Sequence, residues 1–100
     1  MNETAISKNG IPIRLTDERW AHITDEHGEL KGLQTIVLEA IAEPALIVGG
    51  GAGELLAIRE VEVGKYIVVV YRELEVDGFV ITSFLTSRLA VLKRREQLWP

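Results

Sequence analysis

Three apolar segments in the second half of the chain, separated by short turns, constrain the fold more than any other feature. Residues 55–61, 66–73 and 79–86 are rich in β-branched and aromatic residues, and the middle segment holds the uninterrupted run Ile67–Val70. The breaks fall at Gly64-Lys65 and Asp77-Gly78, and the second dipeptide is a strong hairpin signal. The sequence therefore predicts three consecutive antiparallel strands.

The first half of the chain predicts one strand followed by two helices. Residues 11–15 alternate apolar with other residues, and Pro12 places this strand at a sheet edge. Thr16 and two following acids begin a helix over about 17–26. Apolar residues at 33, 36, 37, 40 and 41 mark a second, amphipathic helix that Pro44 ends. Helices first and antiparallel strands after predict an α+β fold with the helices on one sheet face.

The remaining segments carry weaker signals. Residues 45–48 form a short apolar run that suits a strand, and residues 89–98 suit a C-terminal helix. The glycine run 49–53 lacks the lysine and Ser/Thr of a nucleotide-binding loop, and no helix signal follows it. We interpret it as a flexible loop between strands.

Length and composition limit the domain organisation and the chemistry. The 100 residues, 47% of them apolar, predict a single domain over 1–100. The absence of cysteine excludes disulfides, thiolate metal sites and a cysteine nucleophile. No basic N-terminal start with a long apolar run is present, so we expect a cytoplasmic protein with no membrane segment. The net charge of −4 argues mildly against non-specific polyanion binding, although Lys93-Arg94-Arg95, with Arg88 before it, forms one basic cluster.

Both histidines lie within six residues, at the end of the first predicted helix. His22 and His27 are accompanied by Arg19 and by the acids Asp25 and Glu26. An imidazole exchanges protons near neutral pH, so a histidine pair favours acid–base chemistry. A helix end that collects two histidines by chance is the competing interpretation.

The predicted sheet contributes the polar groups that accompany these histidines. Two-residue turns would place Arg59 opposite Val70 and Val70 opposite Leu85, with Arg72 and Ser83 on that same face. Tyr71 would lie on the other face with Thr82 beside it, and a single bulge would reverse part of this assignment. Strand arginines and hydroxyls usually fill a solvated surface. Beside two histidines, however, they suit metal-independent RNA cleavage, in which an arginine stabilises the charge on phosphorus.

Two other chemistries fit the sequence less well. His22 and His27 are five residues apart, whereas helical zinc pairs are usually four apart, and spacing suggests no third ligand. A serine hydrolase would need a G-x-S-x-G turn, which is absent. We therefore expect no metal and no cofactor.

The chain also resembles a known group of domains. The resemblance rests on Arg14-Leu15-Thr16, Arg19 to Ile23, His27-Gly28-Glu29, Glu43-Pro44, Tyr66 to Val70 and Phe79 to Phe84. These segments, spread over about residues 13–88, are similar to the barnase–EndoU–colicin–RelE-like nuclease domains of prokaryotes and phages. The resemblance implies two N-terminal helices packed on a roughly four-stranded antiparallel sheet. It also implies metal-independent RNA cleavage, often as a toxin, and hence RNA and an antitoxin or immunity-like protein as partners.

The same resemblance implies roles for individual residues. It assigns catalytic roles to His22, His27, Arg59 and Thr82. Arg72, Ser83 and Tyr71 are the expected substrate-binding residues. Gly28 departs from the pattern, because a proline is expected after the second histidine. The alternative hypothesis is a catalytically silent protein-binding module of the same fold, which the acidic net charge favours. A third hypothesis is a domain whose histidines only terminate a helix and whose function lies elsewhere.

Overall fold

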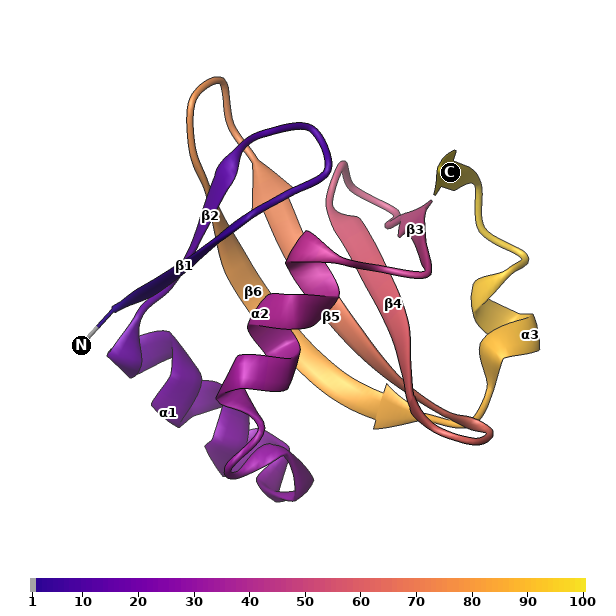
Figure 1. The fold of residues 1–100 in the computed structure, drawn as a ribbon, viewed down its shortest axis with the longest axis horizontal. Coiled ribbons are helices and arrows are strands. Elements are labelled where there is room, and N and C mark those ends of the chain that lie inside the picture. The colour runs from indigo at the N-terminus through magenta and orange to yellow at the C-terminus, as the bar shows by residue number, and fades with distance from the viewer. Residues whose placement is uncertain (1) are drawn as a thin grey trace.

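The computed structural model describes residues 2–100, which form three helices, a single helical turn and seven strands in one α+β domain (Figure 1). The strands are β1 (Glu3–Ile6), β2 (Pro12–Leu15), β3 (Leu46–Gly49), β4 (Leu55–Glu62), β5 (Lys65–Glu73), β6 (Gly78–Thr86) and β7 (Gln97–Trp99). The helices are α1 (Asp17–Glu26), α2 (Gln34–Ala42) and α3 (Leu89–Leu92), with a 3₁₀ turn, η1, at Gly28–Leu30.

All seven strands belong to one mixed sheet in the order β1-β2-β6-β5-β4-β3-β7. The central meander β4-β5-β6 is antiparallel, as the sequence predicted, and only β2 and β6 pair in parallel. The expected sheet of roughly four antiparallel strands was too small, because β1 and the C-terminal β7 also pair. Both are strands of at most four residues without a clear alternating pattern.

The two predicted N-terminal helices are confirmed, and their ends follow from local chemistry. Thr16 caps α1 by accepting the Arg19 N–H at 3.0 Å. The His27 N–H closes the last turn onto the Ile23 carbonyl, and Gly28 then begins η1. The C-terminal segment was predicted wrongly as one helix, because helix α3 stops at Leu92 and the chain returns to the sheet as β7.

Pro12 does begin a strand, but this strand does not lie at the edge of the sheet. Pro12 pairs with Ile6, and β1 covers β2 on its outer side. A proline at the first strand position interrupts little of the ladder. On its inner side β2 reaches β6 only at Gly78 and Phe79, so most of the β6 edge that faces away from β5 has no strand beside it.

The predicted register of the meander was wrong in both hairpins. Arg59 pairs with Ile67, and Val70 pairs with Thr82. The turns lie one or more residues earlier than expected, and bulges shift the register between Glu60 and Glu62 and opposite Val70 and Tyr71. Such a shift exchanges the sheet faces of the side chains beyond it.

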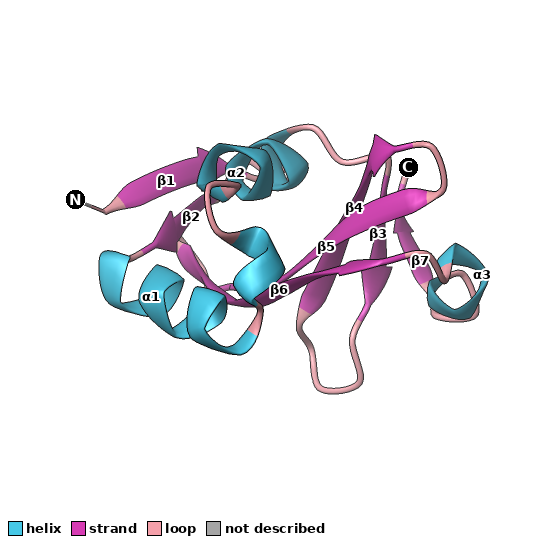
Figure 2. Cartoon of the chain, turned by 90° about the horizontal axis from the view of Figure 1, so that it is seen from below, coloured by secondary structure: helices cyan, strands magenta, loops and turns pink. Residues whose placement is uncertain are grey.

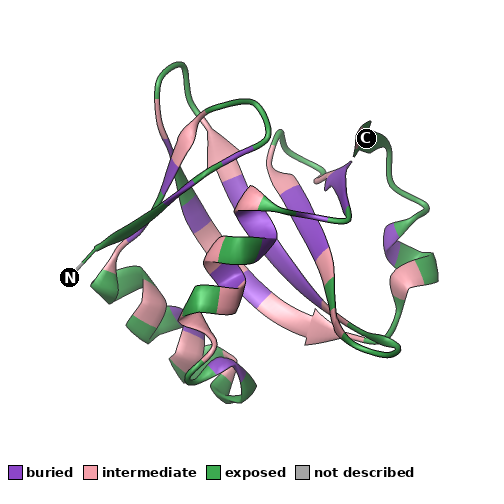
Figure 3. Cartoon of the chain, viewed as in Figure 1, coloured by how far each residue is buried: buried purple, intermediate pink, exposed green. Residues whose placement is uncertain are grey.

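Different helices cover the two faces of the sheet and bury its apolar residues (Figures 2 and 3). Helices α1 and α2 cover one side, and the short α3 covers the other. The helix-side core contains Ala5, Ile13, Leu15, Ile23, Leu30, Val37, Ala40, Ile41, Ala57, Ile67, Val69, Tyr71 and Val80. The second core contains Leu46, Val48, Leu56, Ile58, Val68 and Leu92, with Tyr66, Val70, Phe84 and Leu89 packed against it.

None of the helices described for residues 2–100 has the length and hydropathy that a membrane span requires.

Replacing Ile41 with Ala tests the docking of α2. Ile41 is fully buried in the helix-side core, so the substitution removes packed methylenes and leaves a cavity. We expect the free energy of unfolding to fall by about 2–5 kcal/mol in urea denaturation. Leu38 lies on the same helix but only partly buried, so Leu38→Ala is the matched control with a smaller loss. A loss below about 0.5 kcal/mol for Ile41→Ala would contradict this packing.

Candidate functional site

His22 lies on the outward side of α1, in an acidic environment. Its Nε2 is 2.8 Å from Glu26 Oε1, and its side chain is 60% exposed. It lines an open hollow of about 750 Å³ together with Thr16, Glu18, Arg19, Ala21 and Asp25. Carboxylates therefore surround this imidazole, which makes the hollow a poor place for a phosphate group.

His27 lies elsewhere, at the end of α1 and beside the sheet. Its ring centroid is 6.3 Å from that of Phe84 in β6, and its side chain is 32% exposed. Its Nδ1 faces the Glu29 carboxylate at 3.6 Å. Glu29 therefore lies on the Nδ1 side of the ring, within ion-pair distance but beyond hydrogen-bond distance.

His27 can lie beside β6 because part of one edge of this strand is not paired with another strand. Because β2 leaves this strand after Phe79, helix α1 packs beside the remainder. Arg19 reaches across and donates from Nη1 to the carbonyl oxygen of Ile81 at 3.4 Å. Ile81 is the extra residue of the β6 bulge, since Val70 pairs with Thr82 and Tyr71 with Val80. The bulge thus supplies a carbonyl that helps hold α1, and with it His27, against the strand.

Phe84 belongs to a half-exposed surface on the α3 side of the sheet. Thr82, Phe84 and Thr86 alternate along β6, and Tyr66 pairs with Thr86 from β5. All four are neither fully buried nor fully exposed. We call these four residues the β6 strip. It offers two hydroxyls, a phenol and an aromatic ring beside His27.

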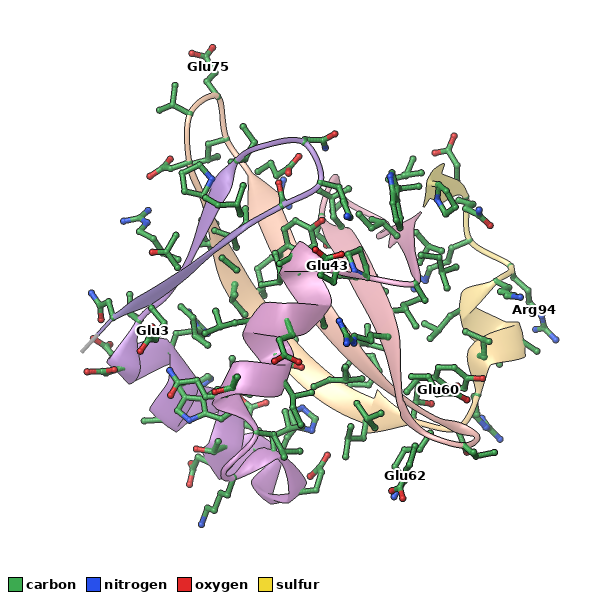
Figure 4. All side chains as sticks on the ribbon, viewed as in Figure 1. Glu3, Glu43, Glu60, Glu62, Glu75 and Arg94 are labelled. Carbon is green, nitrogen blue, oxygen red and sulfur yellow. The ribbon has the colours of Figure 1, made fainter. Side chains whose placement is uncertain are left out.

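Positive charge accompanies this side of the molecule. The C-terminal segment 87–100 holds four basic residues and one acid, whereas residues 17–43 on the other side hold two basic residues and seven acids. The Arg88 N–H donates to Thr86 Oγ1 at 3.1 Å, so this arginine begins where the β6 strip ends. Arg94 points away from α3 into solvent (Figure 4). The two segments that cover opposite faces of the sheet therefore carry net charges of opposite sign.

Arg59 lies on the helix side of the sheet and caps α2. Its Nη1 donates to the Glu43 carbonyl at 3.0 Å, which satisfies a backbone group at the helix C-terminus. It lines a separate small hollow of about 160 Å³ with Ile36, Glu39, Glu60 and Val61. His22 and Arg59 therefore do not line a common hollow.

The remaining predicted site residues are dispersed. Arg72 donates from Nη2 to the Ala52 carbonyl of the β3–β4 loop at 2.9 Å. Ser83 is fully buried and donates to the Val68 carbonyl at 2.7 Å. Tyr71 is fully buried in the helix-side core. A substrate on the surface meets neither Ser83 nor Tyr71 in this structure, whereas Thr82 belongs to the β6 strip.

The sequence did not single out Tyr66, Phe84, Thr86 or Arg88 as site residues. Their grouping depends on the register of β5 with β6 and on the bulge at Ile81. The one available signal was the alternation of hydroxyl and aromatic residues from Thr82 to Thr86, followed by Arg88. Among residues 2–100, no three His, Asp or Glu side chains lie close enough to form a metal site.

Comparison with known proteins adds no relative: no protein-family model, no curated protein and no solved structure matches the chain.

The buried phenol of Tyr71 allows a prediction about the free energy of unfolding. Burial, and secondarily the charge of Glu73, raise the pKa of Tyr71 well above its ordinary value. Its Oη has no hydrogen-bond partner within the described chain, and an unsatisfied buried hydroxyl is costly. We expect Tyr71→Phe to leave the free energy of unfolding unchanged or to raise it by about 1–2 kcal/mol in urea denaturation. Tyr66→Phe, on the half-exposed strip, is the control, and a clear destabilisation by Tyr71→Phe would show that the hydroxyl is satisfied.

Proposed function

We propose that this protein is a metal-independent ribonuclease whose reaction takes place on the β6 strip beside His27. The observation that carries the proposal is the contact between His27 and Phe84 on a hydroxyl-bearing surface that the basic C-terminal segment flanks. An imidazole, several hydrogen-bond donors and an arginine are the groups that RNA cleavage by its own 2′-hydroxyl requires.

Each group has a defined role in this proposal. His27 Nε2 accepts the proton of the 2′-hydroxyl, and the 2′-oxygen forms a bond to phosphorus. The bond from phosphorus to the 5′-oxygen then breaks, and the Tyr66 phenol protonates the leaving oxygen. Arg88 neutralises the charge that builds up on the phosphoryl oxygens, and the hydroxyls of Thr82 and Thr86 donate hydrogen bonds to it. Glu29 lies on the Nδ1 side of the His27 ring, so the proposal assigns the proton transfer to Nε2.

Phe84 and the open surface favour RNA whose bases are unpaired at the cleavage position. An aromatic side chain beside the acid–base group stacks with a splayed base, and this arrangement is common in proteins that bind single-stranded RNA. The outward surface of α1, which carries Glu18, Asp25 and Glu26, would face away from the substrate.

The similarity to barnase–EndoU–colicin–RelE-like domains supports the same proposal. The coarse order of α1 and α2 followed by the antiparallel meander β4-β5-β6 is compatible with this proposal, although the sheet has seven strands and is mixed. We propose accordingly that the protein acts on cytoplasmic RNA as a toxin. Its antitoxin or immunity-like partner would present acidic residues to the basic C-terminal segment.

One observation favours the alternative of a catalytically silent protein-binding module. The β5–β6 turn exposes two apolar side chains, Leu74 at 50% and Val76 at 79%, with Phe79 at 37% nearby in sequence. Exposed apolar groups at a hairpin tip are typical of a contact with another protein. They do not compete with the β6 strip, so a ribonuclease with a protein partner accommodates both features.

Removal of metal and of His27 tests the proposed chemistry. We expect the wild-type protein to cleave unpaired RNA in EDTA and to leave 2′,3′-cyclic phosphate ends, because the RNA's own hydroxyl is the nucleophile. His27→Ala should lower the cleavage rate by about 10²–10⁴, the usual contribution of a general acid or base. Product ends are identified by mass spectrometry, and thermal unfolding verifies that the variant is folded.

His22→Ala is the matched control, since it removes the other histidine of the same helix. It should retain cleavage within a few-fold of wild type, because His22 faces the acidic hollow of α1. If His22→Ala lost activity while His27→Ala remained active, the active site would instead lie in that hollow. A folded wild-type protein that cleaves no RNA would favour the binding module.

A further inference from the structure

The loop between β3 and β4 is held by a carboxylate that folds back into it. Glu54 Oε1 accepts the Ala52 N–H at 2.7 Å, and the Glu54 carbonyl accepts the Gly50 N–H at 2.8 Å. A side chain at Gly50 would collide with the Glu54 carboxylate, and Gly53 has a φ of 90°. The positive φ favours glycine at position 53, and the two hydrogen bonds give the loop a defined conformation.

Two arginines from distant parts of the chain converge on this loop. Arg72 of β5 donates to the Ala52 carbonyl at 2.9 Å, and Arg95, which follows α3, donates to the Gly49 carbonyl at 3.5 Å. Hydrogen bonds from the N–H groups of Ala52 and of Glu54 itself lower the pKa of Glu54. Partial burial opposes this, and the charges of Arg72 and Arg95 lower the pKa by smaller amounts. The Glu54 carboxylate therefore accepts a backbone N–H of the loop, while two guanidinium groups that donate to loop carbonyls add positive charge nearby.

We propose that this loop, Gly49 to Glu54 with Arg72 and Arg95, is a phosphate-binding site in which the Glu54 carboxylate occupies the position of the anion. Backbone N–H groups of a glycine-rich turn together with arginines are the groups that bind phosphate in proteins. The site takes one phosphate group and no nucleotide, because it lacks the lysine and the following helix of nucleotide-binding loops.

A phosphate would replace one set of charge-assisted hydrogen bonds by another. It would accept the N–H groups that Glu54 now occupies, while the arginines would turn from loop carbonyls toward its oxygens. Ala52 and Gly53 are exposed and Glu54 is only partly buried, so an anion in solution can reach the position. Glu54 acts as a built-in competitor that lowers the apparent affinity for phosphate.

The phosphate has two chemical sources, free phosphate or the backbone of an RNA strand. Arg72 lies on the same side of the sheet as the β6 strip, since it alternates with Val70, which packs against the second core. The RNA source rests on the proposed function, whereas binding of the anion itself does not.

Titration of the isotope-labelled protein with inorganic phosphate at constant ionic strength tests the site. The amide signals of residues 50–54 report binding. We expect Glu54→Gln to bind phosphate with a dissociation constant at least about tenfold lower than wild type, because the competing carboxylate is removed. Adding Arg95→Gln to that variant should abolish the gain.

Glu60→Gln is the matched control. Glu60 also accepts a backbone N–H within a turn, from Gly64 at 3.1 Å, so this variant removes the same charge elsewhere. It lies toward the β4–β5 end of the molecule, away from the glycine loop (Figure 4). Equal phosphate affinity in Glu54→Gln and Glu60→Gln, with both variants folded, would overturn the proposal. Failure of RNA cleavage would leave this result unaffected.

A second titration with a 2′-O-methyl RNA oligonucleotide, which lacks the attacking hydroxyl, distinguishes the sources. Shifts of the loop amides with both reagents identify a backbone phosphate as the ligand, and shifts with inorganic phosphate alone identify the free anion. If neither reagent shifts the loop amide signals of Glu54→Gln, the proposed phosphate site is wrong.

Discussion

Strand β5 is buried on both faces, and the arrangement of the whole molecule depends on this constraint. Ile67, Val69 and Tyr71 point into the helix-side core, whereas Val68 points into the second core. A strand buried on both sides needs apolar cover on each, which α1 and α2 provide on one side and the C-terminal segment on the other. Residues 87–100 therefore complete the second core in addition to carrying positive charge.

Most of the helices and strands could be predicted from the sequence, but the register of the strands could not. Helical periodicity located α1 and α2, and the Ile67–Val70 run located the middle strand, because these signals are local. Strand pairing depends on turn lengths and bulges, which the apolar pattern here leaves open. Both hairpins turn earlier than their glycines suggested, so Arg72 and Tyr71 exchanged faces. The short strands β1 and β7 are stabilised by tertiary pairing and had no sequence signal of their own.

The same limitation explains which of the predicted residues the structure brings together. The histidine pair was visible in the sequence, but its two members separate because five residues on a helix turn them about 140° apart. His27 reaches the sheet only because β2 leaves the edge of β6 open. Arg59, which looked like a phosphate contact, satisfies the end of α2. The sequence thus located residues with suitable side chains, whereas the pairing of β6 with its neighbours decides which of them lie close together.

The central claim is that RNA lies on the β6 strip, on the basic side of the sheet. Mapping amide shifts of the labelled wild-type protein with a 2′-O-methyl RNA oligonucleotide tests this most directly, since binding is observed without cleavage. The account predicts perturbations at His27, at residues 82–86 and at Arg88. Perturbations confined to the outward surface of α1 around His22, or none at all, would contradict it.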